Sequence, residues 1–192
     1  MIKYIFTLLS VFILSNLYSQ DINLFQPKEK NTYEIKGEII GLQDTTIMLG
    51  SYYGHNKLAV DTSYVINGLF DFKGQDSLKE GMYFLFVGEK QLFDIIITEQ
   101  KFSLKTNINS PLESMELTNS KENTAFYKYQ KFISSKQKQV TSLREKQKTA
   151  SDKEKEEINA EMIIIDSQVK EFQNEFEEEY SDIFFLKVIK AT

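Results

Sequence analysis

The sequence contains no cysteine, which removes two kinds of chemistry at once. No disulfide can help to hold the fold together, so the chain must fold on apolar burial alone. Thiol–disulfide exchange is also excluded for the chain as given, because that reaction needs a thiolate nucleophile. Proline and glycine are scarce as well, with 2 and 8 residues among 192, which argues against a linker-rich or fibrous protein.

An excess of positive charge is also missing. The formal net charge is −5, and no segment concentrates lysine and arginine on one face. Nucleic acids and anionic membranes both favour a concentrated basic face, so neither is expected as a partner. The hydrophobic fraction of 41% is enough for one ordinary core with an extension.

Residues 1–19 have the pattern of a secretory signal peptide. Lys3 gives a short positive start, an apolar run from Tyr4 to Leu14 follows, and the stretch ends in the small residue Ser19. We expect cleavage after Ser19, which would place the protein in the periplasm or cell envelope without a membrane anchor. The alternative is an uncleaved N-terminal anchor, although the run is shorter than the roughly 20 apolar residues that span a bilayer.

Residues 30–108 are expected to form an antiparallel β domain. Segments rich in β-branched and aromatic residues recur at intervals of about 8 to 12 residues, and turn-forming residues separate them. "YEIKGEII", from Tyr33, alternates apolar and charged residues, which is typical of a strand with one wet face. The pattern predicts an α+β protein whose front half is an antiparallel β-sandwich or a partly open barrel of about seven strands.

The stretch "DTSYVINGLFDFKG", residues 61–74, has acidic and hydroxyl residues that would suit a binding loop. Asn67-Gly68 between two strand-like segments instead indicates a type I′ turn, because these residues reach positive φ at low cost. The alternation then divides the second strand into two faces, Leu69, Asp71 and Lys73 on one and Phe70 and Phe72 on the other. We therefore expect Asp71 to face water and the stretch to be a hairpin.

The other candidate site residues are few. Asp61-Thr62 could bind a cation or a sugar, but one carboxylate beside one hydroxyl is less than catalysis needs, which favours a structural role at a strand end or edge. His55 is the only histidine and cannot build a zinc site without carboxylate or thiolate partners. Tyr52 and Tyr53 could stack on a sugar, although tandem strand aromatics usually divide between core and surface. We assign no catalytic, cofactor-binding or metal-binding residue, and we expect no cofactor and no enzyme activity.

After a polar stretch at residues 109–118, the period changes to that of a helix. Residues 119–180 carry two apolar stripes with steps of three and four, which predict an antiparallel helical hairpin. Ser151, with Glu154 three residues later, forms a capping box for the second helix. The stripes are Phe126, Tyr129, Ile133, Lys136, Val140, Leu143, Gln147 and Ala150, then Ile158, Met162, Ile165, Val169, Phe172 and Phe176.

Both stripes are narrow and lie among Lys, Glu and Gln, which suggests a projecting, coiled-coil-like arm. We favour a spacer or scaffold, with a homodimer through the arm as one use; the alternative is a client-binding arm, as in envelope chaperones. Residues 181–192 predict the start of a further helix, capped by Ser181-Asp182, that is too apolar to remain in water as a tail. Either it packs back on the β domain, or the chain is truncated and once continued toward a contact.

Several segments together resemble a known family. "YEIKGEIIGLQDTTIML", "DTSYVINGLFDFKG", "GMYFLFV", "FDIIITEQKFSLKTN" and "TNSKENTAFYKY" are similar to the N-terminal β domain of unknown function of TlpA/ResA-type thioredoxin-like thiol–disulfide oxidoreductases of Gram-negative envelopes. The closing "EYSDIFFLKVIKAT" looks like the helical connector to their catalytic domain. The resemblance covers roughly residues 30–192. None of its motifs is catalytic, and the Cys-x-x-Cys thioredoxin domain that carries the family's activity is not in this sequence.

The resemblance implies a non-catalytic accessory module that positions or dimerises the redox domain of an exported thioredoxin-like protein, with that domain or another envelope protein as its partner. Two other hypotheses stay open. One is a free-standing envelope protein that binds a ligand or protein near Tyr52, Tyr53 and His55, and the other is a holdase-like chaperone that uses the helical arm. Hydrolase or transferase chemistry is disfavoured, because no convergent acid, base or nucleophile groups are found.

Overall fold

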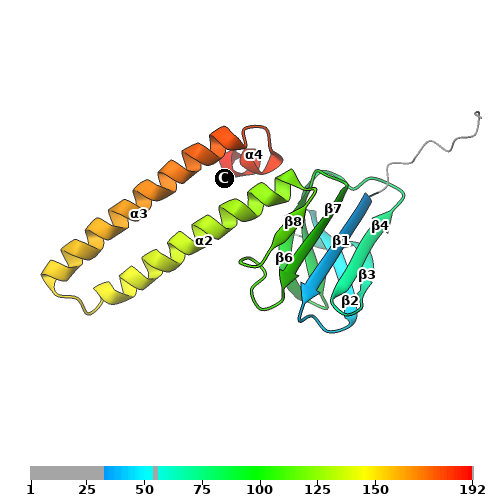
Figure 1. Ribbon diagram of the computed structural model, residues 1–192, viewed down its shortest axis with the longest axis horizontal. Coiled ribbons are helices and arrows are strands. Elements are labelled where there is room, and N and C mark those ends of the chain that lie inside the picture. Colours follow the sequence, from blue (N-terminus) through cyan, green and yellow to red (C-terminus); the bar gives the residue numbers. More distant parts are fainter. Residues whose placement is uncertain (1–32, 54–55, 192) are drawn as a thin grey trace, which may run out of the picture. The chain divides into compact units, whose positions relative to one another are not determined.

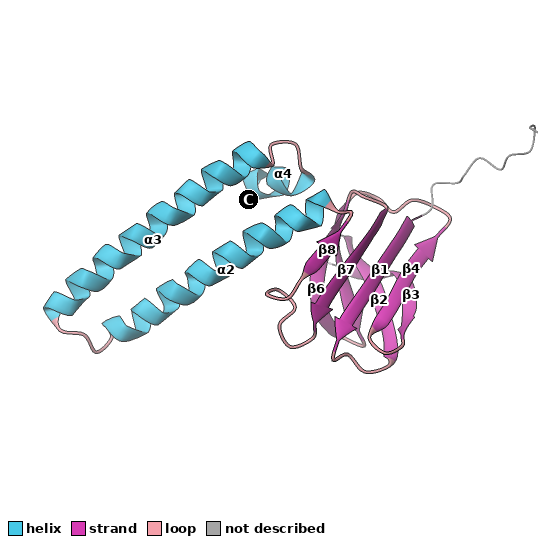
Figure 2. Cartoon of the chain, viewed as in Figure 1, coloured by secondary structure: helices cyan, strands magenta, loops and turns pink. Residues whose placement is uncertain are grey.

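The computed structural model describes residues 33–53 and 56–191 (Figure 1). The signal peptide expected at residues 1–19, and His55, lie outside the described residues. Two four-stranded sheets form a sandwich, and helices α2 to α4 follow them along the chain (Figure 2). None of the helices in the described ranges is long and apolar enough to cross a membrane.

The strands divide between two sheets, sheet A with the order β4-β1-β7-β8 and sheet B with the order β3-β2-β5-β6. The fold is therefore α+β with a sandwich-like β domain, as predicted, and not a closed barrel. The strands are β1 (Tyr33–Ile40), β2 (Thr45–Tyr53), β3 (Asn56–Val65), β4 (Leu69–Gly74), β5 (Gly81–Val87), β6 (Lys90–Ile97), β7 (Lys101–Asn107) and β8 (Glu116–Thr118).

Two features of sheet A differ from the expectation. β1 and β7 pair in parallel, with Ile35 opposite Phe102, whereas the sequence pattern predicts an antiparallel domain. β8 lies within residues 109–118, the polar stretch that follows the predicted β domain, and extends this domain beyond residue 108. Parallel neighbours are joined by a long crossover, so no local turn signal reveals them. A strand of 3 residues is also too short for its alternation to be recognised.

The Asn67-Gly68 turn is present as predicted. Both residues have positive φ, 53° and 80°, and Ile66 and Leu69 exchange backbone hydrogen bonds of 2.9 and 3.0 Å across it. β4 then alternates between exposed and buried residues as expected, with Asp71 exposed. The two strands do not form a regular hairpin, however, because β3 pairs with β2 in sheet B while β4 pairs with β1 in sheet A. The turn carries the chain from one sheet to the other.

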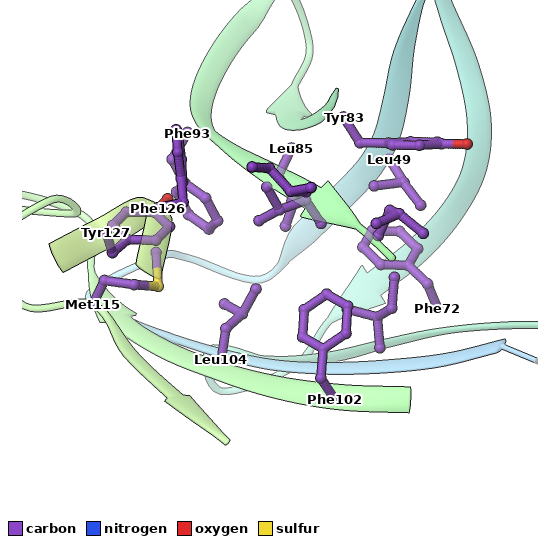
Figure 3. Packing of buried hydrophobic residues seen from close by; sticks show 14 of the residues in the cluster. Leu49, Phe72, Tyr83, Leu85, Phe93, Phe102, Leu104, Met115, Phe126 and Tyr127 are labelled. Atoms are coloured by element: carbon purple, nitrogen blue, oxygen red, sulfur yellow. The ribbon is translucent and has the colours of Figure 1, made fainter. Parts of the chain in front are cut away.

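Aliphatic and aromatic side chains from both sheets fill the space between them (Figure 3). Ile35 and Phe72 from sheet A and Leu49 from sheet B are fully buried. Gly37 on β1 makes room for the ring of Phe70, which lies opposite it on β4. A Cβ atom at position 37 would lie 2.0 Å from Cζ of that ring, so any side chain there would displace Phe70 from the core.

The helical hairpin consists of α2 (Lys121–Gln147) and α3 (Asp152–Glu179), which lie side by side and antiparallel, and the shorter α4 (Phe184–Ala191) follows (Figure 1). The predicted capping box is confirmed. The Ser151 side chain accepts a hydrogen bond from the backbone N–H of Glu154, and the Glu154 carboxylate accepts one from the N–H of Ser151. This box starts α3 directly after the turn and so fixes where the chain reverses.

The apolar stripes predicted on the two helices meet between them. Leu143 of α2 and Ile158 and Ile165 of α3 are buried in a cluster of their own. Val140 and Met162 pack against this cluster. Most other positions on this part of the hairpin are exposed, which agrees with the narrow stripes seen in the sequence.

The base of the hairpin shares the core of the sandwich. Phe126 of α2 and Phe176 of α3 belong to the same buried cluster as the strand residues, and Figure 3 shows Phe126 among them. Phe185 of α4 packs on both, with ring centroids 5.0 Å from Phe126 and 6.3 Å from Phe176. The terminal helix therefore packs on the base of the hairpin, whereas the sequence analysis expected it to pack on the β domain or to continue toward a contact. The hydrophobic core therefore contains side chains from both the β domain predicted at residues 30–108 and the hairpin predicted at residues 119–180.

Candidate functional site

A groove of about 720 Å³ lies over the outer face of sheet A. Tyr64, Ile66 and Leu69, which surround the Asn67-Gly68 turn, form its apolar side and are 75%, 61% and 56% exposed. The polar lining consists of Lys36, Glu38, Asn67, Asp71, Ser103, Lys105, Glu116 and Thr118. An exposed apolar patch bordered by polar residues is typical of a protein contact surface.

Several charges in the groove are paired within the sheet. Lys105 on β7 contacts Glu38 on the neighbouring strand β1 at 2.8 Å, and Lys73 contacts Asp71 along β4. The hydrogen bond from Lys105 to Glu38, and the negative charge of Glu38, raise the pKa of Lys105. The lining residues include no histidine and no cysteine.

The outer face of sheet B carries a smaller aromatic and polar cluster. The ring of Tyr52, 46% exposed, lies 4.8 Å from that of Phe84, and Nζ of Lys57 lies 5.1 Å from the Phe84 ring. Lys57 donates to Oε1 of Gln91 at 2.8 Å, and Nε2 of Gln91 donates to Asp94 at 2.7 Å. Burial raises the pKa of Asp94 in spite of the opposing effects of Gln91 and Lys57. The Tyr52 ring and the Lys57 side chain are both exposed, so a ligand can reach them.

Asp61 joins the two sheets. Its Oδ2 accepts a hydrogen bond from the hydroxyl of Tyr33 at 2.6 Å, and its Oδ1 accepts one from the backbone N–H of Thr62 at 2.7 Å. Tyr33 belongs to β1 in sheet A and Asp61 to β3 in sheet B, so the bond ties the sheets together. Burial, followed by the bond to the Asp61 carboxylate, raises the pKa of Tyr33, so the phenol stays a hydrogen-bond donor.

The remaining candidates do not converge on Asp61. Thr62 and Asp71 are exposed on separate strands. Tyr53 lies at the end of β2, and His55 is outside the described residues. Within residues 33–53 and 56–191, no three acidic or histidine side chains are grouped as a metal site.

Two side chains that the sequence analysis does not single out fix the start of α2 to the edge strand β6. Asn123, which is fully buried, accepts a hydrogen bond from the N–H of Ile96 and donates one to its carbonyl, both at 2.7 Å. One turn further, the Tyr127 hydroxyl donates to the carbonyl of Asp94 at 2.8 Å. Asn123 takes the place that the backbone of a further strand would occupy, so α2 covers this edge of sheet B.

Two glutamates cap helices that lie far from them in the sequence. Glu99, just after β6, accepts hydrogen bonds from the first two N–H groups of α2 at 2.8 and 3.2 Å. Glu122 on α2 accepts from the N–H groups of Phe184 and Phe185 at 3.0 and 2.6 Å. A carboxylate at a helix N-terminus satisfies free N–H groups and is stabilised by the helix dipole. The sequence analysis predicts Ser181-Asp182 as the cap of α4. In the structure, Glu122 caps this helix instead.

Glu99 makes the stability depend on pH. Burial alone would raise its pKa, but hydrogen bonds from the Glu122 N–H and from the hydroxyls of Ser120 and Thr98 outweigh burial and hold the pKa below its ordinary value. A carboxyl group of this kind stabilises the fold above its unfolded pKa of about 4.3, and the stabilisation is lost as the pH falls through the lower folded pKa. Between about pH 6 and pH 3, we expect the wild type to lose more unfolding free energy than Glu99→Gln does in urea titrations.

Glu145→Gln is the matched control, because Glu145 is exposed on α2 and makes its contact with Lys148 at the surface. This variant should keep the pH dependence of the wild type. Equal pH dependence in the wild type and Glu99→Gln would contradict the capping role of Glu99.

Comparison with known families finds one match, which covers part of the chain. Residues 33–126 match the family described as a domain of unknown function, DUF4369. The matched segment runs from the first residue of β1 to the second turn of α2, so it includes both sheets and the residues Glu99 and Asn123. No curated protein and no solved structure matches the chain.

Proposed function

We propose that the chain is a non-catalytic accessory module of an exported thioredoxin-like thiol–disulfide oxidoreductase, and that it positions or dimerises the redox protein in the cell envelope. The strand, turn and connector motifs quoted above support this proposal. The chain has no thiol of its own, so the redox chemistry belongs to the partner.

The observation that carries the proposal is the rigid junction between the sandwich and the hairpin. Asn123 and Tyr127 fix α2 to β6, Glu99 caps α2, and Glu122 ties α4 to α2. A module that positions a partner must hold its own contact surfaces in a fixed relation to each other. Buried and fully satisfied hydrogen bonds provide that rigidity, which a flexible linker would lack.

We assign the contact with the redox protein to the groove over sheet A. Its apolar side, formed by Tyr64, Ile66 and Leu69, is exposed, and its polar side carries paired charges. A transient protein contact uses an apolar centre with a polar surround and does not need a deep pocket. We therefore expect a dissociation constant of about 1–100 µM, within the range of transient complexes.

Isothermal titration calorimetry of the purified protein with the thioredoxin-like oxidoreductases encoded in the same genome tests this function. We expect binding to at least one of them. The variant Tyr64→Ser/Ile66→Ser/Leu69→Ser should weaken that binding by at least about tenfold, because it removes the apolar centre of the contact. Tyr52→Ser is the matched control, since it removes an exposed aromatic ring from the other sheet, and it should bind like the wild type.

Absence of binding to every one of these oxidoreductases would overturn the proposed function. Weaker binding in Tyr52→Ser, with wild-type binding in the triple variant, would move the contact to the outer face of sheet B. That second outcome would refute the assignment of the groove while leaving the class of partner intact.

A further inference from the structure

Two isoleucines on α3 point away from α2. Ile163 and Ile164 are 67% and 57% exposed, whereas the next residue, Ile165, is 5% exposed and packs between the helices. At about 100° per residue, the exposed pair lies on the side of α3 opposite its buried stripe. Two adjacent large aliphatic side chains on a charged solvent face mark a contact surface.

The stripe of residues around Ile164 keeps the heptad spacing of a helix–helix contact. Its members, at alternating steps of four and three and all exposed, are Lys153, Glu157, Ala160, Ile164, Ser167 and Glu171. Ala160 and Ser167 are small and flank Ile164, which allows a second helix to approach closely. The stripe begins with a positive charge and ends with a negative one.

This outer stripe is complementary to itself in the antiparallel orientation. A two-fold axis at the level of Met162 relates positions that are equally distant from it in the two copies. The opposed pairs are then Ile164 with Ala160, Glu157 with Ser167, and Lys153 with Glu171. No ion pair within the described residues occupies Lys153 or Glu171, so both charges are available. A parallel arrangement would instead place like charges together at both ends, which is unfavourable.

We propose that two copies of this chain associate through α3 in an antiparallel contact centred on Ile164, with Lys153 of each copy paired to Glu171 of the other. The inference rests on the dimerising part of the proposed function and names the face that would serve it. The contact spans residues 153–171, about 27 Å of helix, and a single helix face of that length is a small interface. We therefore expect a weak dimer, with a dissociation constant on the order of 10–100 µM.

Sedimentation velocity of the purified protein alone, between about 5 and 500 µM, measures this association. The average mass should rise from monomer toward dimer over this range. Ile164→Ser and Lys153→Glu should each weaken the association by at least about threefold. The double swap Lys153→Glu/Glu171→Lys should restore it to within about twofold of the wild type, because the exchanged charges pair again across the axis. Lys146→Glu, an exposed charge change on α2, is the matched control and should associate like the wild type.

The substituted side chains are exposed, so these variants should fold, and far-UV circular dichroism checks this. A monomer at every concentration, or a dimer that the charge swap does not restore, would overturn the inference. If Ile164→Ser self-associates like the wild type but binds the oxidoreductase more weakly, the exposed face of α3 contacts that partner instead. This result would also overturn the dimer inference. Self-association is measured without the oxidoreductase, so a failure here is distinct from a failure of the proposed function.

Discussion

Replacing Asn123 by leucine is expected to lower the free energy of unfolding by about 3 kcal/mol. Leucine has nearly the same shape as asparagine but cannot bond to the backbone of Ile96. Both backbone groups of Ile96, a residue 0% exposed, would then be buried without partners, and each such group costs about 1–3 kcal/mol. The Ser120 hydroxyl would also lose the amide that donates to it at 2.9 Å. Urea unfolding followed by circular dichroism measures the change.

Asn174→Leu is the matched control, because Asn174 is exposed on α3, and its effect should stay within about 0.5 kcal/mol. Hydrogen exchange at the Ile96 amide gives a second measurement. In Asn123→Leu this amide should exchange faster than in the wild type, because α2 no longer covers the edge of β6. A loss below about 1 kcal/mol with unchanged exchange at Ile96 would contradict the role assigned to Asn123.

The sequence predicts the strands well where their signals are local. The alternation in β1 and the positive φ of Asn67-Gly68 depend on neighbouring residues, and both are present. The described residues form eight strands, where about seven are predicted. The parallel pairing of β1 with β7, and the passage from β3 to β4 between sheets, depend on which faces are buried together. The burial of these faces involves residues far apart in the chain, so no short stretch of sequence can predict the pairing.

The junction residues could not be predicted for the same reason. Glu99, Glu122 and Asn123 have side chains that are usually solvated, and in the sequence they look like ordinary polar residues beside a helix start. Their partners lie on β6, α2 and α4, so only the tertiary structure shows that they are satisfied. Asp61 is the opposite case. Its residue type suggests a site, but its partner is Tyr33 on the other sheet.

Three of the four sheet edges have features that oppose pairing with another chain, and β4 is the fourth edge strand. The β6 edge is covered by α2 through Asn123, and β8 at the edge of sheet A has only 3 residues. β3, the other edge of sheet B, has an irregular register opposite Leu49 and Gly50. Short strands, irregular register and covering helices all oppose pairing with a strand of another molecule. These features do not oppose a contact through the exposed face of α3, because that contact needs no strand pairing.

Phe176→Ala is expected to lower the free energy of unfolding by about 3–5 kcal/mol. Phe176 is 2% exposed, and its ring lies 5.1 Å from that of Tyr129 and 4.8 Å from that of Tyr180. It also belongs to the buried cluster that contains the strand residues, so a cavity here weakens the sandwich and the hairpin together. Val169→Ala, a truncation at a half-buried position on the same helix, is the matched control and should cost about 1 kcal/mol.

The urea dependence of hydrogen exchange in Phe176→Ala distinguishes one cooperative unit from two. If the base of the hairpin and the sandwich fold as one unit, amides of β1 and of α3 should lose protection over the same range of urea, shifted downward from the wild type. This follows because the side chains of both elements pack in a single core. Early loss of protection in α3, with β1 unchanged from the wild type, would make the hairpin an independent arm. The rigid junction would then be absent, and with it the main support for a positioning role.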